Sequence, residues 1–202
     1  LPVLTGSNDK PDRDDSRHRL TALMKNAASK ANDVGLLIAI ASKDLSMPSR
    51  YLELAELYLK NGDAGLAAKC AEEGIALFPG GRSLSLEYFL IERYAENDRG
   101  AEALDMAWKL FCRTPSLQNY RRLHRIAGPL GCWSTQRTAS LSWLAAQPAD
   151  RHTSNSLPDQ SLRIEIALWE KDLTGAWEAC CSGTCRVPLL LLLAEALEDD
   201  AP

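Results

Sequence analysis

The sequence predicts an all-α fold in which helical hairpins stack as a right-handed solenoid. Apolar residues recur at spacings of three and four along much of the 202-residue chain, which is the period of one helix face. A stretch of the chain also repeats itself 36 positions later (94 − 58), as stacked helical units do. The repeated residues are Tyr58, Ala67, Ala71 and Pro79, which return as Tyr94, Ala103, Ala107 and Pro115.

A period of about 34 to 36 residues with these residue types is typical of tetratricopeptide-like (TPR-like) α-α hairpins. Small residues let the two helices of a hairpin approach closely, and the tyrosines fill the space between neighbouring helices. Each proline ends a second helix because it lacks the backbone donor that another turn would need. Such hairpins cannot bury their apolar faces alone, so they stack and present grooves rather than a catalytic pocket.

The organisation follows from breaks in this pattern. Residues 1–15 are polar and are predicted to form a flexible leader. Residues 16–202 are predicted to form a single helical-repeat domain of about ten helices. Within it, a helix over 36–41 is apolar on nearly every side and should be buried. Clear hairpins are expected at 48–79 and 84–115, a degenerate hairpin at 116–148, and C-terminal helices at 158–199.

One segment of the C-terminal part carries two conflicting signals. Leu162, Ile164, Ile166 and Leu168 alternate with period two, which is the pattern of a half-buried strand. The surrounding sequence is helical throughout and offers no partner strand. The prediction for this segment is therefore a helix.

Composition describes an ordinary globular protein with 46% hydrophobic and 25% charged residues and a net charge of −4. The longest apolar run, 187–194, is shorter than the roughly 18 residues of a membrane span. Adjacent cysteines such as Cys180 and Cys181 rarely bridge each other, so the six cysteines favour a reducing, cytoplasmic location. The chain begins at Leu1 without a secretion signal, and we expect it to be part of a larger protein.

Several segments resemble the helical region of bacterial SWIM zinc-finger proteins and their zinc-free, uncharacterised relatives. These segments are 51–56, 101–108, 115–123, 164–172 and 176–179, and the resemblance runs from about Leu36 to Leu197. The resemblance implies a TPR-like fold and leaves function open. A SWIM motif requires a CxC pair followed by a CxH pair, and this sequence contains neither. The zinc and nucleic-acid properties of that finger therefore cannot be assigned to any residue here.

Cys180, Cys181 and Cys185 come nearest to a metal or redox cluster. Three residues separate Cys181 from Cys185, a spacing that zinc sites use, and His152 could supply a fourth ligand. The favoured interpretation is a helix end with packed thiols, so no metal and no cofactor are predicted. The histidines, including His124, accompany no recognised catalytic motif. The chain is predicted not to be an enzyme.

Arginines gather in one section of this acidic chain. Arg121 and Arg125 lie one helical turn apart on the same face, where guanidinium groups could bind phosphate or carboxylate. The alternatives are a solvated surface paired with acidic neighbours, a partner contact, or association with nucleic acid that weakens in salt. The cluster consists of Arg113, Arg121, Arg122, Arg125 and Arg137.

Protein–protein interaction or scaffolding is the function that this fold class favours, with a protein or peptide partner of unknown identity. No membrane association is expected, nucleic acid is a weaker alternative, and a homodimer is possible. In a TPR-like alignment the first helix of each hairpin faces a groove, and charge changes from acidic to basic along it. The groove residues predicted in this way are Leu52, Glu56, Lys60, Tyr88, Glu92, Glu96, Arg121 and Arg125.

Overall fold

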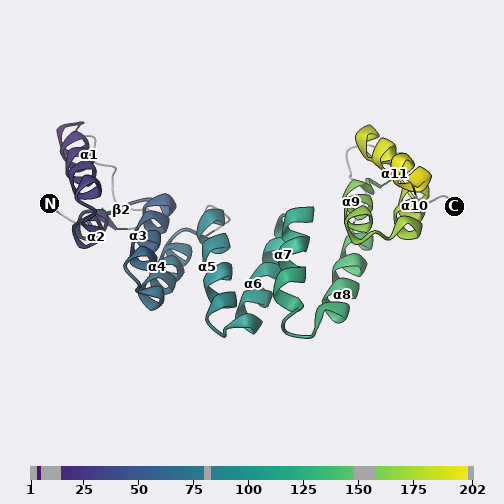
Figure 1. Ribbon diagram of the computed structural model, residues 1–202, viewed down its shortest axis with the longest axis horizontal. Coiled ribbons are helices and arrows are strands. Elements are labelled where there is room, and N and C mark those ends of the chain that lie inside the picture. Colours follow the sequence, from purple (N-terminus) through teal and green to yellow (C-terminus); the bar gives the residue numbers. More distant parts are fainter. Residues whose placement is uncertain (1–3, 6–14, 80–82, 148–157, 200–202) are drawn as a thin grey trace. The chain divides into compact units, whose positions relative to one another are not determined.

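The computed structural model describes residues 4–5, 15–79, 83–147 and 158–199 (Figure 1). Within these ranges lie eleven helices and two strands of two residues each. The chain divides into two compact units, residues 1–103 and 104–202, and each is described by itself. Most of the expected leader, and His152, lie outside the described residues.

The first unit begins with a short parallel pairing of strands β1 (Leu4–Thr5) and β2 (Asp44–Leu45). Helices α1 (Asp15–Lys30) and α2 (Val34–Ala41) lie between these strands in the sequence. The Asp33 side chain caps α2 by accepting a hydrogen bond from the Leu36 amide at 2.9 Å. The prediction that this helix is buried is wrong for most of its length. Ile40 and Ala41 are buried, whereas Leu36 is 43% exposed, because α1 and α3 cover only part of the helix surface.

The core of the first unit is the hairpin of α3 (Pro48–Lys60) and α4 (Ala64–Leu77), against which α5 (Leu84–Glu96) packs (Figure 1). Close approach here depends on small residues, as the sequence predicted. Ala55, Ala67 and Ala71 have no exposed surface. A Cβ at Gly74 would lie 2.8 Å from both Leu86 Cδ1 and Tyr51 Cβ. Helix α4 can therefore lie this close to α3 and α5 because glycine has no side chain at this position.

Helix α6 (Gly100–Arg113) begins in the first unit and ends in the second. It stops before Pro115, and α4 likewise stops before Pro79, as predicted. The second unit continues with α7 (Leu117–Ala127) and α8 (Trp133–Ala145). The Ser116 hydroxyl caps α7 by accepting a hydrogen bond from the Asn119 amide at 3.2 Å.

Three further helices complete the second unit: α9 (Ser161–Glu170), α10 (Leu173–Cys181) and α11 (Val187–Asp199). The prediction that the alternating segment is a helix is confirmed. Ile164 and Ile166 are both fully buried, because α9 packs against α7, α10 and α11 and is covered on more than one side. Two small clusters hold this corner together, Ile164 with Ala179 and Leu189, and Ala167 with Ala176 and Leu193.

The predicted all-α fold of TPR-like helical hairpins is confirmed by these elements. The helices of the hairpins expected at 48–79, 84–115 and 116–148 are α3 and α4, α5 and α6, and α7 and α8. In the described part of the chain, no helix has the length and apolar character needed to cross a membrane.

The close approach at Gly74 generates a stability prediction. Gly74→Ala should lower the free energy of unfolding by about 1–3 kcal/mol, because the new methyl group overlaps Leu86 and Tyr51. Gly65→Ala is the matched control, since it lies on the same helix and a Cβ there meets nothing within 4 Å. The control should be neutral or stabilise the protein by up to about 1 kcal/mol through helix propensity. Urea denaturation of both variants checks this, and equal effects would contradict it.

Candidate functional site

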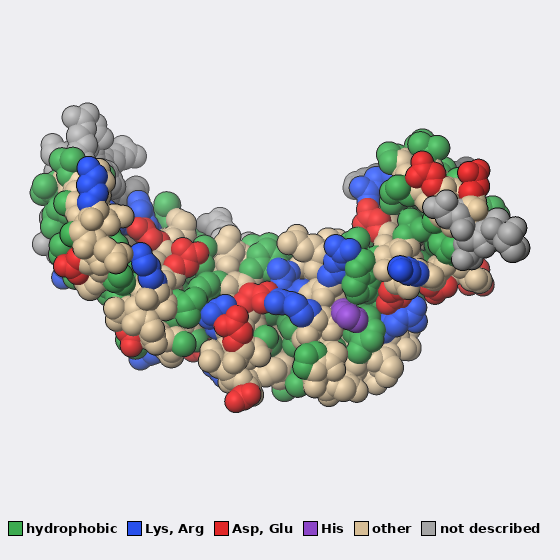
Figure 2. All heavy atoms as spheres, in the orientation of Figure 1, with side chains coloured by type: hydrophobic (Ala, Val, Ile, Leu, Met, Phe, Trp, Pro, Cys, Tyr) green, Lys and Arg blue, Asp and Glu red, His purple; other side chains and the backbone are tan. Residues whose placement is uncertain are grey.

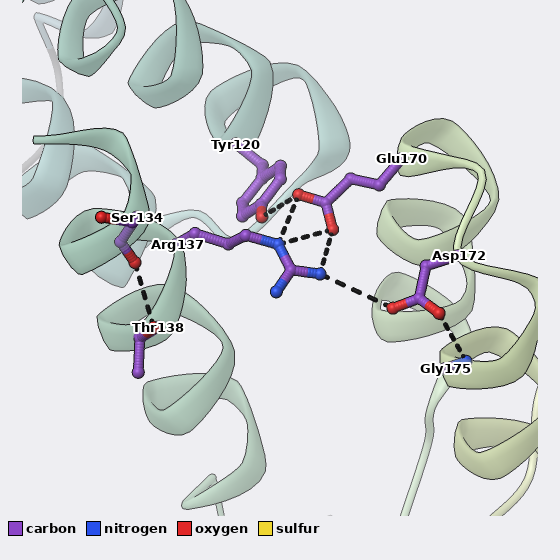
Figure 3. Close-up of polar contacts among 7 residues, drawn as sticks. All are labelled: Tyr120, Ser134, Arg137, Thr138, Glu170, Asp172 and Gly175. Atoms are coloured by element: carbon purple, nitrogen blue, oxygen red, sulfur yellow. Dashed lines mark hydrogen bonds and ion pairs between the residues drawn. The ribbon is translucent and has the colours of Figure 1, made fainter. Parts of the chain in front are cut away.

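The carboxylate of Glu170 joins three helices of the second unit (Figure 3). Tyr120 of α7 donates its hydroxyl hydrogen to Glu170 Oε1 at 2.7 Å. Arg137 of α8 donates from Nε to both carboxylate oxygens at 3.0 and 2.9 Å, and from Nη2 to Oε2 at 2.6 Å. Glu170 is the last residue of α9. One carboxylate thus accepts all the hydrogen bonds that link these three helices in this network.

Asp172 extends the same network towards α10. Its Oδ2 lies 3.6 Å from Arg137 Nη2, while its Oδ1 accepts the Gly175 amide at 2.9 Å and so caps α10 (Figure 3). The arginine therefore reaches both carboxylates that flank Lys171. Lys171 itself has a left-handed backbone conformation with φ of 62°, which turns the chain sharply between α9 and α10.

Burial shapes the ionisation of this network. Tyr120 has no exposed surface, and burial, followed by its hydrogen bond to Glu170, raises the pKa of its phenol. The hydrogen bond to Glu170 is likewise the main reason that the pKa of Arg137 is raised. The tyrosine thus stays neutral and the arginine stays charged at any ordinary pH, which keeps the network intact.

Four rings pack around one another beside this network. Tyr120 and His124 lie one turn apart on α7, and each contacts both Trp133 of α8 and Trp169 of α9. The ring centroid of His124 lies 4.7 Å from that of Trp133 and 5.2 Å from that of Trp169. The ring centroid of Tyr120 lies 5.3 Å from that of Trp133 and 6.0 Å from that of Trp169. All four pairs are close to perpendicular, which is a favoured aromatic geometry.

Three of these rings, His124, Trp133 and Trp169, line an open depression of about 400 Å³ in the second unit together with the charged groups. Tyr120 is fully buried and contacts two of the lining rings, whereas His124 is exposed. On the rim, the guanidinium of Arg121 lies 5.3 Å from the centre of the Trp169 ring. We call this feature the aromatic depression; its lining residues are His124, Trp133, Arg137, Trp169, Glu170 and Asp172.

The chemistry of the aromatic depression suits recognition. Both oxygens of Glu170 accept hydrogen bonds, so this carboxylate orders its neighbours. Tryptophan, tyrosine and arginine are the residues in which the binding energy of protein interfaces concentrates. Figure 2 shows basic, acidic and hydrophobic side chains intermixed on the visible face of this unit.

The first unit contains a similar tyrosine–carboxylate–arginine arrangement. Tyr94 of α5 donates to Glu72 of α4 at 2.5 Å, and Arg99 donates to the same oxygen at 3.1 Å. The Arg99 guanidinium also lies 3.7 Å from the centre of the Tyr94 ring. Burial and the hydrogen bond to Glu72 raise the pKa of Tyr94 to about 12. Each unit therefore buries a tyrosine whose hydroxyl is bonded to a carboxylate shared with an arginine.

Six of the eight predicted groove residues lie in the first unit. Leu52 lines a hollow of about 280 Å³ between the beginnings of α3 and α5, together with Met47, Ser85 and Leu86 among others. The remaining five do not line it: Glu96 is paired with Arg93 at 2.7 Å, Glu56 and Lys60 are exposed, and Tyr88 and Glu92 are half-buried.

The other two predicted groove residues, Arg121 and Arg125, are exposed on α7 in the second unit. Arg121 stacks on Trp169 at the rim of the aromatic depression, and Arg125 follows His124 in the sequence. Of the wider arginine cluster, Arg137 is held by Glu170 and Asp172, and Arg122 donates to Asn119 at 2.8 Å. Much of the basic charge is thus engaged within the protein.

The cysteine cluster appears as free thiols among the described residues, where all six cysteines are unbridged. Over those same ranges, no group of three or more His, Cys, Asp or Glu side chains is arranged to hold a metal ion. His152, the suggested fourth ligand, lies outside them.

Sequence reasoning missed most of the aromatic depression. The spacing of Tyr120 and His124 places both on one face of a helix, and this signal was available. Trp133 and Trp169 were visible as apolar residues of helices. Their convergence on that face depends on how α8 and α9 pack against α7, over separations as long as 50 residues between Tyr120 and Glu170. No local pattern specifies such packing.

The hairpins and their packing define the class of this protein, an all-α TPR-like repeat protein. No protein-family model matches the sequence, and no curated protein matches it either. The resemblance to the helical region of SWIM proteins therefore stays a prediction.

Solved structures with some similarity include MamA of AMB-1, at 17% identity and a TM-score of 0.47 over 94% of this chain and 96% of that one. MamA of MSR-1 has 16% identity and a TM-score of 0.45 over 93% and 100%. A kinesin light chain of Podosopora anserina, described as having nearly identical TPR-like repeats, has 20% identity and a TM-score of 0.45 over 95% and 98%. Similarities of this strength bear on neither the site nor the function.

The raised pKa of Tyr94 predicts how stability changes with alkaline pH. A phenol whose pKa is about 12 in the folded protein and about 10 when unfolded keeps its proton longer in the folded state. Its contribution to stability is complete below pH 10 and is lost as pH rises from about 10 to 12, by at most about 1.4 kcal/mol per pH unit. Urea unfolding at a series of pH values should show a shallower decline in Tyr94→Phe than in the wild type. Equal slopes would contradict the assignment.

Proposed function

We propose that this chain is a non-enzymatic protein-interaction module and that the aromatic depression is its main anchor for a partner. The observation that supports this most directly is the grouping of two indoles, an imidazole and an arginine around an open depression. Side chains of these types dominate the energetics of protein interfaces when they are rigid and well packed.

Rigidity is the second reason for this choice. The ring contacts and the hydrogen bonds to Glu170 fix the walls of the aromatic depression before any partner arrives. Preorganised side chains lose little conformational entropy on binding, so more of the contact energy appears as affinity. The two indoles would receive an apolar or cationic side chain of a partner peptide, and the surrounding charges would fix its orientation.

The hollow beside Leu52 in the first unit is proposed as an additional contact. It is lined by four apolar residues and three serines, a composition that suits an apolar side chain with neighbouring backbone polar groups. Glu56, Lys60, Tyr88, Glu92 and Glu96 remain proposed groove residues on the same two helices.

A protein partner is favoured over nucleic acid. Binding to nucleic acid draws on arginines that are available to neutralise phosphates. Here Arg137 is paired with two carboxylates, Arg121 stacks on an indole and Arg122 donates to Asn119. From the sequence alone, we also propose that the protein is bacterial and cytoplasmic. The same holds for its relationship to the helical region of SWIM proteins.

Affinity capture with a matched pair of variants tests the proposal. His124→Ala removes an exposed ring that lines the aromatic depression. Gln118→Ala is the control, because Gln118 is also exposed on α7. At about 100° per residue, Gln118 lies about 240° around the helix from His124 and so on a different face. Specific protein bound by the wild type should be bound at least about fivefold less by His124→Ala, a loss of roughly 1 kcal/mol. The control should retain full binding, and both variants should keep the circular dichroism spectrum and melting temperature of the wild type.

Three outcomes would overturn the proposal. Equal recovery of the partner with both variants would show that the aromatic depression is not the anchor. Recovery of nucleic acid that is removed by moderate salt would favour the alternative function. Recovery of nothing except further copies of the same chain would make the surface a contact between copies instead.

A further inference from the structure

Two cysteines lie together at the corner between α10 and α11. Cys180 is the next-to-last residue of α10, and Cys185 lies in the connection that leads to α11. Both side chains are partly buried and pack against the same three core residues, Ile164, Ala179 and Leu189. Cys180 is also among the groups that raise the pKa of Cys185, through its proximity. They are therefore neighbours in space as well as in sequence.

The backbone around Cys185 is held in place on both sides. The Gln160 amide donates to the Thr184 carbonyl at 2.7 Å, and the Thr184 amide donates to the Pro158 carbonyl at 3.0 Å. On the other side of Cys185, the Arg186 amide donates to the Ser161 hydroxyl at 3.0 Å. This connection is thus fixed against the start of α9, and it keeps the thiol of Cys185 beside the end of α10.

Cys181 provides a contrast within the same turn. It is exposed, and it is not among the side chains that pack against the core residues shared by Cys180 and Cys185. Successive residues of a helix point about 100° apart, so Cys180 faces the core where Cys181 does not. The fold thereby favours Cys180 over Cys181 as the partner of Cys185.

We propose that Cys180 and Cys185 form a dithiol that is oxidised to a reversible disulfide by exchange with a low-molecular-weight disulfide such as oxidised glutathione. This inference is independent of the proposed partner-binding function. It requires the two sulfurs, which pack against the same core cluster, to approach to about 2.05 Å, which side-chain rotation at the end of a helix can supply.

The exchange balances in two steps. The Cys180 thiolate attacks one sulfur of oxidised glutathione, forms a mixed disulfide and releases one glutathione thiolate. The Cys185 thiolate then attacks the Cys180 sulfur of that mixed disulfide, forms the Cys180–Cys185 bond and releases the second glutathione thiolate. The two protons lost by the cysteines protonate the two released thiolates, so the protein is oxidised by two electrons and glutathione is reduced.

The surroundings of Cys185 agree with this order of attack. Burial and the nearby Cys180 raise the pKa of Cys185, so this residue keeps its proton in the resting dithiol. Cys185 then acts as the resolving thiol once Cys180 has reacted. The exchange should become faster as pH rises, because the reacting species is the thiolate.

The bond would act on the docking of α11. Cys180 packs against both clusters that hold this helix, one through Leu189 and the other through Leu193. A covalent link from Cys180 to Cys185, two residues before α11 begins at Val187, would tie the end of one helix to the approach to the next. Oxidation should therefore make the corner of α10 and α11 more rigid. The exposed leucines of α11 (Leu190, Leu191 and Leu192) would stay exposed.

Peptide mapping after equilibration in glutathione redox buffers tests the proposal on the whole chain. Trypsin releases residues 172–186 as one peptide that holds Cys180, Cys181 and Cys185, and Cys70, Cys112 and Cys132 fall in other peptides. After the exchange is quenched with an alkylating reagent, the oxidised peptide should carry one label, on Cys181, and a Cys180–Cys185 disulfide. The reduced peptide should carry three labels.

The same mapping in concentrated guanidinium supplies the decisive comparison. In the unfolded chain, the bonds Cys180–Cys185 and Cys181–Cys185 should form in comparable amounts, because the spacings are nearly equal. In the folded chain, packing should favour Cys180–Cys185 by about tenfold or more, through its higher effective concentration. Cys181→Ser should keep this bond, and Cys185→Ser should abolish it and leave Cys180 as a mixed disulfide with glutathione.

Two results would overturn the proposal. One is a folded protein in which Cys181 acquires glutathione over the whole range of redox buffers while Cys180 and Cys185 both remain labelled. The other is a ratio of the two disulfides that does not change between the folded and unfolded chain, since the fold would then contribute nothing to the pairing.

Discussion

Three helices of the second unit are joined at the carboxylate of Glu170, and the arrangement of the aromatic depression depends on these contacts. The carboxylate accepts the buried hydroxyl of Tyr120 and the forked guanidinium of Arg137 at distances of 2.6 to 3.0 Å. A tyrosine hydroxyl without exposed surface requires an acceptor, because an unpaired buried donor costs about 1–3 kcal/mol. The carboxylate in turn needs its arginine, because an unpaired buried charge is costlier still.

The rings are ordered by this polar contact. Tyr120 cannot turn away from Glu170 without losing its acceptor, and its ring sets the positions of Trp133 and Trp169, which contact it from opposite neighbouring helices. Those two indoles then contact the exposed ring of His124. A partly buried ion pair thereby orders the residues of an exposed surface. A pair of this kind is retained for the specificity of the geometry more than for net stability.

The fold could be read from the sequence because its determinants are local. Repeated alanines and Gly74 allow close helix packing, prolines end helices, and apolar spacing identifies each helix, so an all-α fold of TPR-like hairpins could be predicted. Burial of the helix over 34–41 could not be predicted in the same way. Its composition is apolar throughout, yet the exposure of Leu36 depends on how much of the helix α1 and α3 cover.

The candidate site depends on contacts that no spacing rule provides. Arg121 was singled out because it lies one turn from Arg125, and the structure places it against Trp169, a residue from another helix. For the arginine cluster that includes Arg137, pairing with acidic neighbours was one of the alternatives, and the guanidinium of Arg137 is bound to Glu170. In both cases the sequence identified the right type of residue and could not identify its partner, because the partner lies 33 or more residues away (170 − 137).

A double-mutant cycle on the free energy of unfolding would test the central claim, that Glu170 couples Tyr120 and Arg137 into one network. Tyr120→Phe, Arg137→Gln and the double variant would be measured by urea denaturation. The account predicts that the two single effects do not add, with an interaction energy of about 1 kcal/mol, because both substitutions disrupt hydrogen bonds to the same carboxylate. Strict additivity would show that the two residues contact Glu170 independently and would contradict the account.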